Sequence, residues 1–320
     1  MDLLKELQGC KNIVIVGHVR PDGDCVGSVM STYLYLKNAM PKAYVVPMIE
    51  KPAEEFKVIS NLADIRSDFA SDVDIFDAFI GVDCSTVDRY GEKAYPYFES
   101  AGRKIIIDHH VSNDGFGDVS LIDGNASSTC ELLYSVMDPK FIDVEVAKAL
   151  YIGIIHDTGV LQYSCVSPKT LRIVADLVEY GFNFPDIIES TFYEKTRVQN
   201  EMLGRGLMES ILFNDGKCIV AKIDQKVMDF YGATPHDLDG IVNQLRYTKG
   251  VEVAIFMYEV EPEVYKVSLR SRGTVDVAKI AKFYNGGGHA RAAGFTMNGT
   301  FHDVVNNISD SISIQLEKQN

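Results

Sequence analysis

Acidic and imidazole side chains gather in four short stretches of the N-terminal half, each beside an apolar run. They are His18, Asp22, Asp24, Asp83, Asp108, His109, His110, His156 and Asp157. Carboxylate and imidazole ligands without thiolates favour Mn²⁺, Mg²⁺ or Fe²⁺ over a thiolate zinc site. Several carboxylates placed together repel one another unless cations lie between them. The ligands suffice for two metal ions, and a two-metal centre with ions about 3.5–4 Å apart suits phosphoryl hydrolysis.

Each stretch, taken alone, also has a purely structural explanation. Residues 22–24 are typical of a turn followed by a helix cap. Asp83 could begin a loop, residues 109–110 could form a packed strand end, and residues 157–159 could end a helix. The prediction of a metal site therefore depends on whether the four stretches meet in space.

The elements that must position these residues alternate between strands and helices. Apolar, β-branched runs predict strands over 11–19, 76–85 and 102–110, and helical patterns occupy 25–40, 145–159 and 167–181. Asp24 stands at the expected N-cap of the first of these helices. Such alternation predicts a mostly parallel sheet flanked by helices. Ligands bind beyond the carboxyl ends of the strands in such sheets, so the polar stretches should meet at one edge.

The C-terminal part differs in pattern and predicts a second domain. Residues 186–210 are charged and helical in character, and we interpret them as a connection. Shorter strands follow over 217–223, 251–260 and 263–272, before a last helix over 301–318. The predicted class is α/β, with a larger N-terminal domain over 1–185, a helical linker over 186–210 and a smaller C-terminal α/β domain over 211–320.

Composition and charge exclude several kinds of protein. The chain has 320 residues and a formal net charge of −14, which is a poor surface for long nucleic acid. There is neither an apolar run of transmembrane length nor a signal-peptide pattern, so we expect a cytoplasmic protein without a membrane partner. The six cysteines form no C-x-x-C pair, which argues against a zinc ribbon or a disulfide framework.

The C-terminal part contains a candidate anion site in two stretches. Ser268, Arg270 and Arg272 alternate along a predicted strand and would share one face, where two guanidinium groups could bind a phosphate. The sequence NGGGHARAAGF provides Gly286, Gly287 and Gly288, whose backbone N–H groups could form an anion nest, and the side chains of His289 and Arg291. In isolation, a solvated strand edge and a flexible turn are the simpler interpretations.

The order of the motifs resembles that of the DHH phosphoesterase superfamily. H-x-x-x-D-x-D is followed by V-D-C-S, D-H-H and H-D-T-G, and G-G-G-H stands near the C-terminus. The set covers nearly the whole chain, and it is similar to the oligoribonuclease and pAp-phosphatase branch with a DHH-associated C-terminal domain. That resemblance implies an active site in the cleft between two domains.

The resemblance also implies roles for individual residues and a manganese cofactor, with Mg²⁺ or Co²⁺ as substitutes. His18, Asp22 and Asp83 would hold one metal, and Asp24, Asp83, His109 and Asp157 the other. Asp108 would orient a neighbour, and His110 would face the phosphate or the leaving oxygen. Because adjacent strand residues point to opposite sides, Asp108, His109 and His110 should not all face the metals. Substrate would be bound by Ser268, Arg270, Arg272, Gly287, Gly288, His289 and Arg291.

The activity implied by the resemblance is hydrolysis of dinucleotides such as pApA and other short RNA to mononucleotides, and of pAp to AMP. The mechanism would be in-line attack of a metal-bridged hydroxide. Alternatives are a cyclic-dinucleotide phosphodiesterase, a single-strand exonuclease and a catalytically silent nucleotide-binding module. A homodimer is also implied by the resemblance.

Overall fold

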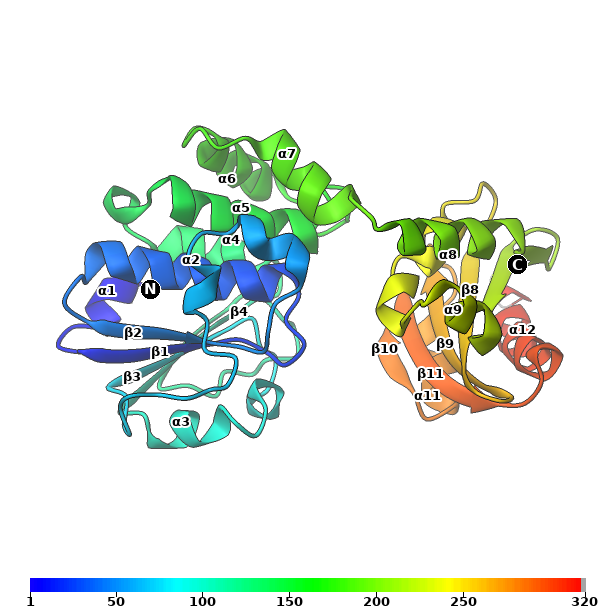
Figure 1. Cartoon of the computed structure of the whole chain (residues 1–320), viewed down its shortest axis with the longest axis horizontal. Helices are drawn as coiled ribbons and strands as arrows, with labels where there is room; N and C mark the ends of the chain where they lie inside the picture. The colour runs from blue at the N-terminus through cyan, green and yellow to red at the C-terminus, as the bar shows by residue number, and fades with distance from the viewer. Residues whose placement is uncertain (318–320) are drawn as a thin grey trace. The chain divides into compact units, whose positions relative to one another are not determined.

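The chain forms two compact units, Met1–Glu194 and a second that begins at Lys195 (Figure 1). The computed structural model describes residues 1–317. Each unit has its own sheet and its own buried core. The predicted connection over 186–210 divides between the units, because its first part ends the first unit and its later helix packs in the second.

The first unit is built on a five-stranded parallel sheet with the order β2-β1-β3-β4-β5. The strands are β1 (Asn12–Val16), β2 (Tyr44–Met48), β3 (Ala78–Val82), β4 (Arg103–Asp108) and β5 (Val119–Ile122). In β1, Ile13 and Ile15 belong to the core on one face, and Val14 and Val16 belong to the core on the other. Burial on both faces explains the continuous apolar runs and confirms the predicted parallel sheet.

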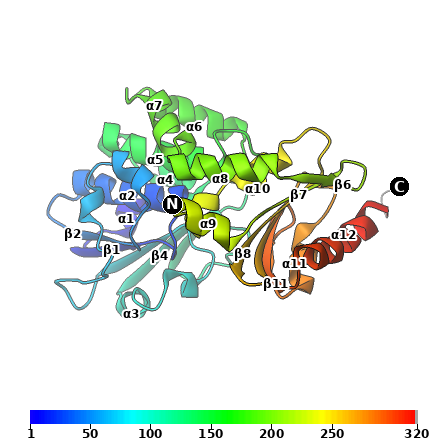
Figure 2. The ribbon, with the colours of Figure 1, turned by 45° about the vertical axis from the view of Figure 1, so that its right-hand side comes forward.

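Helices cover both faces of this sheet. The α-helices are α1 (Leu3–Glu6), α2 (Gly23–Ala39), α3 (Tyr95–Ser100), α4 (Thr129–Val136), α5 (Val144–Asp157), α6 (Pro168–Val178) and α7 (Phe184–Ile188). Short 3₁₀ turns are η1 (Glu54–Val58), η2 (Leu62–Asp64), η3 (Val87–Tyr90) and η4 (Pro139–Phe141), and the π-turn η5 (Glu189–Tyr193) ends the unit. Figures 1 and 2 show α2, α4 and α5 on one face and α3 on the other. The chain direction across the sheet reverses between β1 and β3, the point at which such sheets bind ligands.

The cap of α2 is Asp22, not Asp24 as the sequence suggested. The backbone N–H of Cys25 donates to Asp22 Oδ1 over 3.1 Å, so the helix begins at Gly23. Asp24 therefore lies inside the first turn, where its side chain is 1% exposed. The correction places two carboxylates on either side of Gly23 in different environments, one at the helix end and one in the core.

The second unit is smaller and contains a six-stranded sheet with the order β10-β11-β9-β8-β7-β6. The strands are β6 (Ile211–Phe213), β7 (Cys218–Ile223), β8 (Val253–Glu261), β9 (Val264–Ser271), β10 (Gly287–His289) and β11 (Ala292–Asn298). Only β7 and β8 pair in parallel, and the other pairs are antiparallel. The predicted smaller α/β domain is thus confirmed, with a mostly antiparallel sheet.

Helices also cover the second sheet. They are α8 (Arg197–Met208), α9 (Gln225–Tyr231), η6 (Pro235–Leu238), α10 (Ile241–Arg246), α11 (Val277–Phe283) and α12 (Phe301–Glu317). One buried core joins the sheet to α8, α9 and α10, and another joins it to α11 and α12 (Figure 2). Among the helices of residues 1–317, none is both long enough and apolar enough to span a membrane.

Candidate metal centre

The carboxyl ends of three neighbouring strands supply the centre of the site. His18 follows β1, Asp83 directly follows β3, and His109 directly follows β4. Because β1, β3 and β4 are adjacent in the sheet, these side chains meet at the edge that the sequence predicted. Asp24 from the first turn of α2 and Asp157 from the end of α5 complete the cluster.

Asp83 stands between two histidines and presents one oxygen to each. Its Oδ2 lies 3.5 Å from His18 Nε2, and its Oδ1 lies 3.6 Å from His109 Nε2. The residue is 2% exposed and has a φ of +53°, a left-handed conformation that is uncommon for residues other than glycine. Such conformations are retained mainly at functional sites. The two oxygens of this buried carboxylate thus face two different imidazoles.

The first half of the cluster is formed by His18, Asp22 and Asp83. His18 Nε2 lies 3.6 Å from Asp22 Oδ1, and His18 Nδ1 lies 2.9 Å from the carbonyl oxygen of Val19. The Nδ1–H therefore donates to this carbonyl, which leaves Nε2 as the atom that faces the carboxylates. The thiol of Cys25 is also near, since ligand atoms of His18, Cys25 and Asp83 all lie within 4.8 Å of one another.

The second half of the cluster is formed by Asp24, His109 and Asp157. His109 Nε2 lies 3.3 Å from Asp157 Oδ2 and 4.0 Å from Asp24 Oδ2. The buried carboxylate of Asp24 accepts backbone hydrogen bonds from Thr129 and Cys130, over 2.6 and 3.1 Å. These N–H groups begin α4, so the helix dipole adds to the stabilisation of the carboxylate.

Close helix packing makes room for the Asp24 carboxylate. A Cβ atom at Gly153, in α5, would lie 2.8 Å from Asp24 Oδ1 and 2.2 Å from Cys130 Sγ. A side chain at this position would therefore displace the carboxylate from the helix N-terminus. The sequence around Gly153 reads as an ordinary apolar helix, so this requirement was visible only in the structure.

His110 and Asp108 form a pair beside the cluster. His110 Nδ1 donates to Asp108 Oδ1 over 2.7 Å, and the amide of Asn113 donates to Asp108 Oδ2 over 2.8 Å. The strand ends at Asp108, so the expected alternation of direction does not extend to the histidines. His109 and His110 both approach Asp83 Oδ1, at 3.6 and 3.8 Å, whereas the carboxylate of Asp108 is turned to His110 and Asn113.

Burial and mutual repulsion dominate the protonation of the cluster. Burial raises the pKa of Asp157 to about 7, and the charge of Asp83 adds to the effect. Burial, followed by Asp83 and Asp157, holds the pKa of Asp24 well above its ordinary range. Burial opposes a charge on His18, but hydrogen bonds to Asp22 and Asp83 outweigh it and raise its pKa to about 10. Protons and imidazolium groups thus provide positive charge where the ligand set would accept cations.

His156 lies next to this cluster without joining it. Its Nε2 is hydrogen-bonded to Thr191 Oγ1 over 3.0 Å, and its ring stands edge-on to Phe56 and Phe192. A Cβ atom at Gly23 would lie 2.3 Å from the ring. Burial lowers the pKa of His156 to about 4, so the ring is a neutral packing element.

Two residues that support the cluster were missed as functional residues by sequence reasoning. The hydroxyl of Thr129 donates to Asp83 Oδ1 over 3.1 Å. The preceding residue, Ser128, caps α4 by accepting a hydrogen bond from Glu131 N. Asn113 fixes Asp108 and also donates to the carbonyl of Cys84. The polar string around Thr129 was the only signal in the sequence.

The donor set fits hard divalent cations. Two groups of Asp and His ligand atoms, each within 4.8 Å of one another, share His109, namely Asp83–His109–His110 and Asp24–His109–Asp157. Carboxylate oxygens and imidazole nitrogens suit Mn²⁺, Mg²⁺ or Fe²⁺. The buried negative charge of these carboxylates favours the binding of cations.

In the second unit, Ser268 and Arg270 are half-buried on one face of β9. Arg270 Nε donates to Asn243 Oδ1 over 3.0 Å, and its Nη1 donates to the carbonyl of Leu269 over 3.0 Å. Arg272 lies just beyond the end of the strand, so it does not continue the alternation, and it donates to the carbonyls of Arg246 and Thr248. Each of these acceptors is uncharged, and the bonds fix the orientation of the guanidinium groups.

The glycine stretch forms an edge strand where the sequence suggested a turn or loop. Gly287, Gly288 and His289 form β10, which pairs with β11. A Cβ atom at Gly288 would lie 2.4 Å from the carbonyl oxygen of Ala292, so glycine is needed for close approach of the two strands. His289 is exposed, and the exposed Arg291 lies over Gly273.

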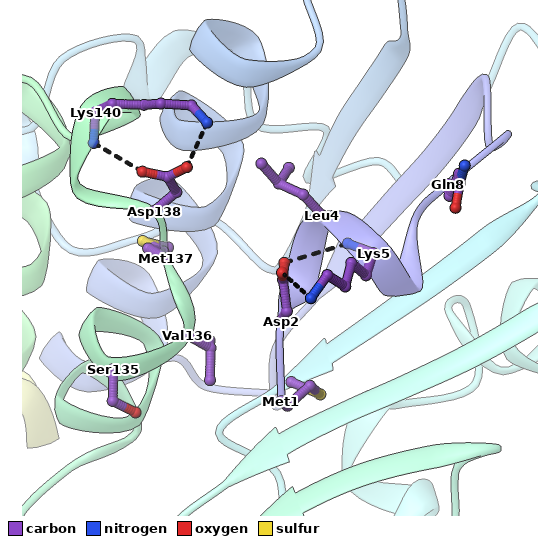
Figure 3. A pocket seen from close by; sticks show the side chains of 10 residues that line it. All are labelled: Met1, Asp2, Leu4, Lys5, Gln8, Ser135, Val136, Met137, Asp138 and Lys140. Atoms are coloured by element: carbon purple, nitrogen blue, oxygen red, sulfur yellow. Dashed lines mark hydrogen bonds and ion pairs between the residues drawn. The ribbon is translucent and has the colours of Figure 1, made fainter.

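A hollow of about 580 Å³ lies elsewhere in the first unit, between α1 and the end of α4 (Figure 3). Its charged side chains are paired locally, Lys5 with Asp2 and Lys140 with Asp138. None of the described residues that line it belongs to the four motifs. It therefore has no part in the metal centre.

The fold and the site together define a two-unit α/β protein with a carboxylate–histidine metal centre at a topological switch point. Residues 12–154 match the DHH family, N-terminal domain, and residues 215–317 match the DHHA1 domain. The chain therefore contains a DHH-family N-terminal domain followed by a DHHA1 domain.

Curated relatives share nearly the whole length of the chain. The bifunctional oligoribonuclease and PAP phosphatase NrnA of Bacillus subtilis is 24% identical and aligns over 92% of this chain and 91% of its own. The protein of the same name from Thermus thermophilus is 27% identical over 93% of this chain and 87% of its own. These relatives, by their names, are phosphoesterases, and the chain is an enzyme of this class.

One solved structure is similar over the whole fold. An exopolyphosphatase-related protein from Bacteroides fragilis superposes with a TM-score of 0.89 and 26% sequence identity, covering 99% of this chain and 96% of the other. The two-unit architecture is therefore shared with a protein of known structure.

Proposed function

We propose that the chain hydrolyses short oligoribonucleotides, including dinucleotides such as pApA, to mononucleotides, and pAp to AMP. The position of Asp83 is the main observation behind the proposal. Its Oδ2 lies 3.5 Å from His18 Nε2, and its Oδ1 lies 3.6 Å from His109 Nε2. The names of the relatives at 24% and 27% identity support these substrates. The acidic surface, with a net charge of −14, also favours short substrates over long nucleic acid.

The Asp and His residues of the cluster would hold two divalent cations, which we expect to be Mn²⁺. His18, Asp22 and Asp83 would hold one, and Asp24, Asp83, His109 and Asp157 the other. When bound, such cations activate water near neutral pH and neutralise charge on phosphate oxygens. Thr129 and the start of α4 would keep Asp83 and Asp24 in place, as supporting hydrogen bonds do in metal sites.

His110 would supply a proton to the reaction. Its hydrogen bond to Asp108 raises its pKa to about 9, and Nδ1 carries the proton that Asp108 accepts. At neutral pH its Nε2 also carries a proton. The ring is partly exposed, so Nε2 would donate to a phosphate oxygen or to the leaving oxygen. Asp108 positions the ring and has no contact with substrate in this scheme.

The second unit would bind the substrate phosphates. Arg270 and Arg272 donate to an amide oxygen and to backbone carbonyls, and these bonds would orient their guanidinium groups for an incoming anion. Ser268, His289 and Arg291 would add donors, and the backbone of Gly287 and Gly288 would allow close approach. Binding of substrate in a cleft between the units, a homodimer and a cytoplasmic location remain predictions from the sequence.

The direct test is a Mn²⁺-dependent hydrolysis assay. The substrates are pApA, a series of 5′-phosphorylated RNAs of increasing length, pAp and pyrophosphate. We expect turnover of pApA and of the shortest RNAs, with pAp dephosphorylated as well. Turnover of pyrophosphate alone would contradict the oligonucleotide function while leaving the metal centre intact. No turnover of any substrate would favour a nucleotide-binding module without activity.

A further inference from the structure

The turn that follows Asp157 has a backbone conformation that is rare for its residues. Gly159, Val160 and Leu161 have φ angles of +55°, +57° and +62°. The left-handed region is unfavourable for residues with a side chain, above all for a β-branched valine. Several such residues in succession persist only where surrounding structure holds them, and they concentrate at functional sites.

Thr158 holds this turn through both its side chain and its backbone. Its hydroxyl donates to the carbonyl of Ile154 over 2.6 Å and accepts from the N–H of Leu161 over 3.1 Å. Its carbonyl accepts from the N–H groups of Gln162 and Tyr163, over 2.9 and 3.0 Å. The turn is thus tied to the last helical turn of α5 and has one defined conformation.

The other end of the turn is tied to α4 and α6. Ser167 and Thr170 form a capping box at the start of α6. The hydroxyl of Thr170 donates over 2.7 Å to Glu131 Oε2, and this glutamate is 1% exposed. Both ends of the segment between Thr158 and Ser167 are therefore fixed to the helices that also position Asp24 and Asp157.

The turn places the ring of Tyr163 on the backbone of Gly159. A Cβ atom at Gly159 would lie 2.4 Å from the ring carbon Cζ, so only glycine allows this contact. Tyr163 is nevertheless 43% exposed, while Gly159 beneath it is buried. One part of the ring is supported by backbone two residues from Asp157, whose Oδ2 lies 3.3 Å from His109.

We propose that Tyr163 is a stacking surface for the base of a nucleotide bound at the metal centre. The inference rests on the proposed function and adds the part of the substrate that Tyr163 contacts. Carboxylates and imidazoles that hold cations would contact only the phosphate and the attacking water, so they would not by themselves select a nucleotide over another phosphate ester. A preorganised aromatic ring supplies this selection, and it tolerates any base because every base has a π face.

The test compares two ligands that differ only in the base. AMP and ribose 5-phosphate share the sugar phosphate, and their dissociation constants are measured by isothermal titration into the Mn²⁺-loaded protein. We expect AMP to bind about tenfold more tightly than ribose 5-phosphate, at the lower end of the usual range for stacking of one base. Equal dissociation constants in the unmodified protein would overturn the proposal.

Three variants assign the preference to the ring. Tyr163→Leu keeps a side chain on Gly159 without an aromatic face, and we expect the preference for AMP to fall to about one. Tyr163→Phe should keep the preference, because the hydroxyl has no part in stacking. Tyr95→Ala removes a tyrosine of similar exposure, 40%, from α3 and should leave the preference unchanged.

The possible results separate this inference from the proposed function. A preference for AMP that survives in Tyr163→Leu would overturn the stacking role, whether or not pApA is hydrolysed. Absence of pApA hydrolysis together with a Tyr163-dependent preference for AMP would overturn the proposed activity and leave the stacking role in place. Circular dichroism of each variant establishes that the fold is kept.

Discussion

The two units differ in the sign of the charge that they gather and in the partners of the charged side chains. In the first, buried carboxylates face one another around Asp83, and protons or imidazolium groups must offset their repulsion. In the second, Arg270 and Arg272 donate to an amide oxygen and to backbone carbonyls, which orient their positively charged groups. The first region is therefore suited to bind cations, and the second is suited to bind anions.

The comparison also concerns how firmly each region is held. The carboxylates of the metal centre are held by additional hydrogen bonds. Thr129 donates to Asp83 through its hydroxyl and to Asp24 through its backbone N–H. Asn113 and His110 likewise serve Asp108. The positive region includes the exposed residues His289 and Arg291. The difference suggests that changes in the first region alter the chemical step, whereas changes in the second alter binding.

Removal of the bridging carboxylate should have the largest effect. In Asp83→Ala, neither histidine retains its shared partner, so we expect activity to fall by more than about 100-fold, beyond what loss of a supporting group costs. Mn²⁺ content per chain, measured by mass spectrometry of the metal, should fall as well. Asp68→Asn, at an exposed loop position, is the matched control. Normal Mn²⁺ content and turnover in Asp83→Ala would rule out the bridging role.

Removal of an oriented guanidinium should weaken substrate binding. In Arg270→Ala we expect KM for pApA to rise at least about tenfold, since a hydrogen bond to a charged group contributes about 1.5–3 kcal/mol. Steady-state kinetics at saturating Mn²⁺ measure the change, and metal content should stay normal. Arg197→Ala removes an exposed arginine from α8 as the control. An unchanged KM in Arg270→Ala would show that Arg270 does not bind the substrate.

Loss of the hydroxyl of Thr129 should have an intermediate effect on Mn²⁺ binding at the metal centre. Thr129→Val removes the donor to Asp83 but keeps the backbone bond to Asp24, so we expect Mn²⁺ affinity to fall about tenfold. Thr129→Ser keeps a hydroxyl and should restore most of the affinity. If Val and Ser variants bind Mn²⁺ equally well, the hydroxyl has no positioning role.

The pH dependence of stability should be the smallest effect. Because burial and Asp83 raise the pKa of Asp157 to about 7, the folded state loses stability as this carboxyl ionises with rising pH. The raised pKa values of His18, about 10, and His110, about 9, act in the same direction, because their contribution disappears as they lose protons. Metal-free protein should therefore melt a few degrees lower at about pH 9 than at about pH 6.

Added Mn²⁺ should reverse this trend. Cation binding must displace the protons of Asp157 and His18, so the rise in melting temperature caused by Mn²⁺ should grow with pH. Asp157→Asn should raise the melting temperature of the metal-free protein at alkaline pH and reduce the effect of Mn²⁺. Differential scanning calorimetry with and without a chelator measures these melting temperatures. Parallel pH profiles for the unmodified protein and Asp157→Asn would contradict the role of Asp157 in this pH dependence.

The sequence by itself determined the parallel sheet, the second domain and most of the residues at the metal centre. Strand residues buried on both faces leave a continuous apolar run that can be recognised without a structure. Polar residues directly after such runs, as with Asp83 and His109, must lie at the carboxyl edge of the sheet. These features depend on periodicity and chain order, which are local properties.

Only the tertiary structure decided which atoms meet. Thr129 contacts Asp24 from 105 positions away and Asp83 from 46 positions away, and no local pattern encodes such contacts. His156, inside a polar motif, turns to Thr191 instead of the cluster. The glycines around Gly288 serve close strand packing, although their sequence suggests a loop. Packing of one element on another selects these contacts, because sterics and burial act between residues distant in the chain.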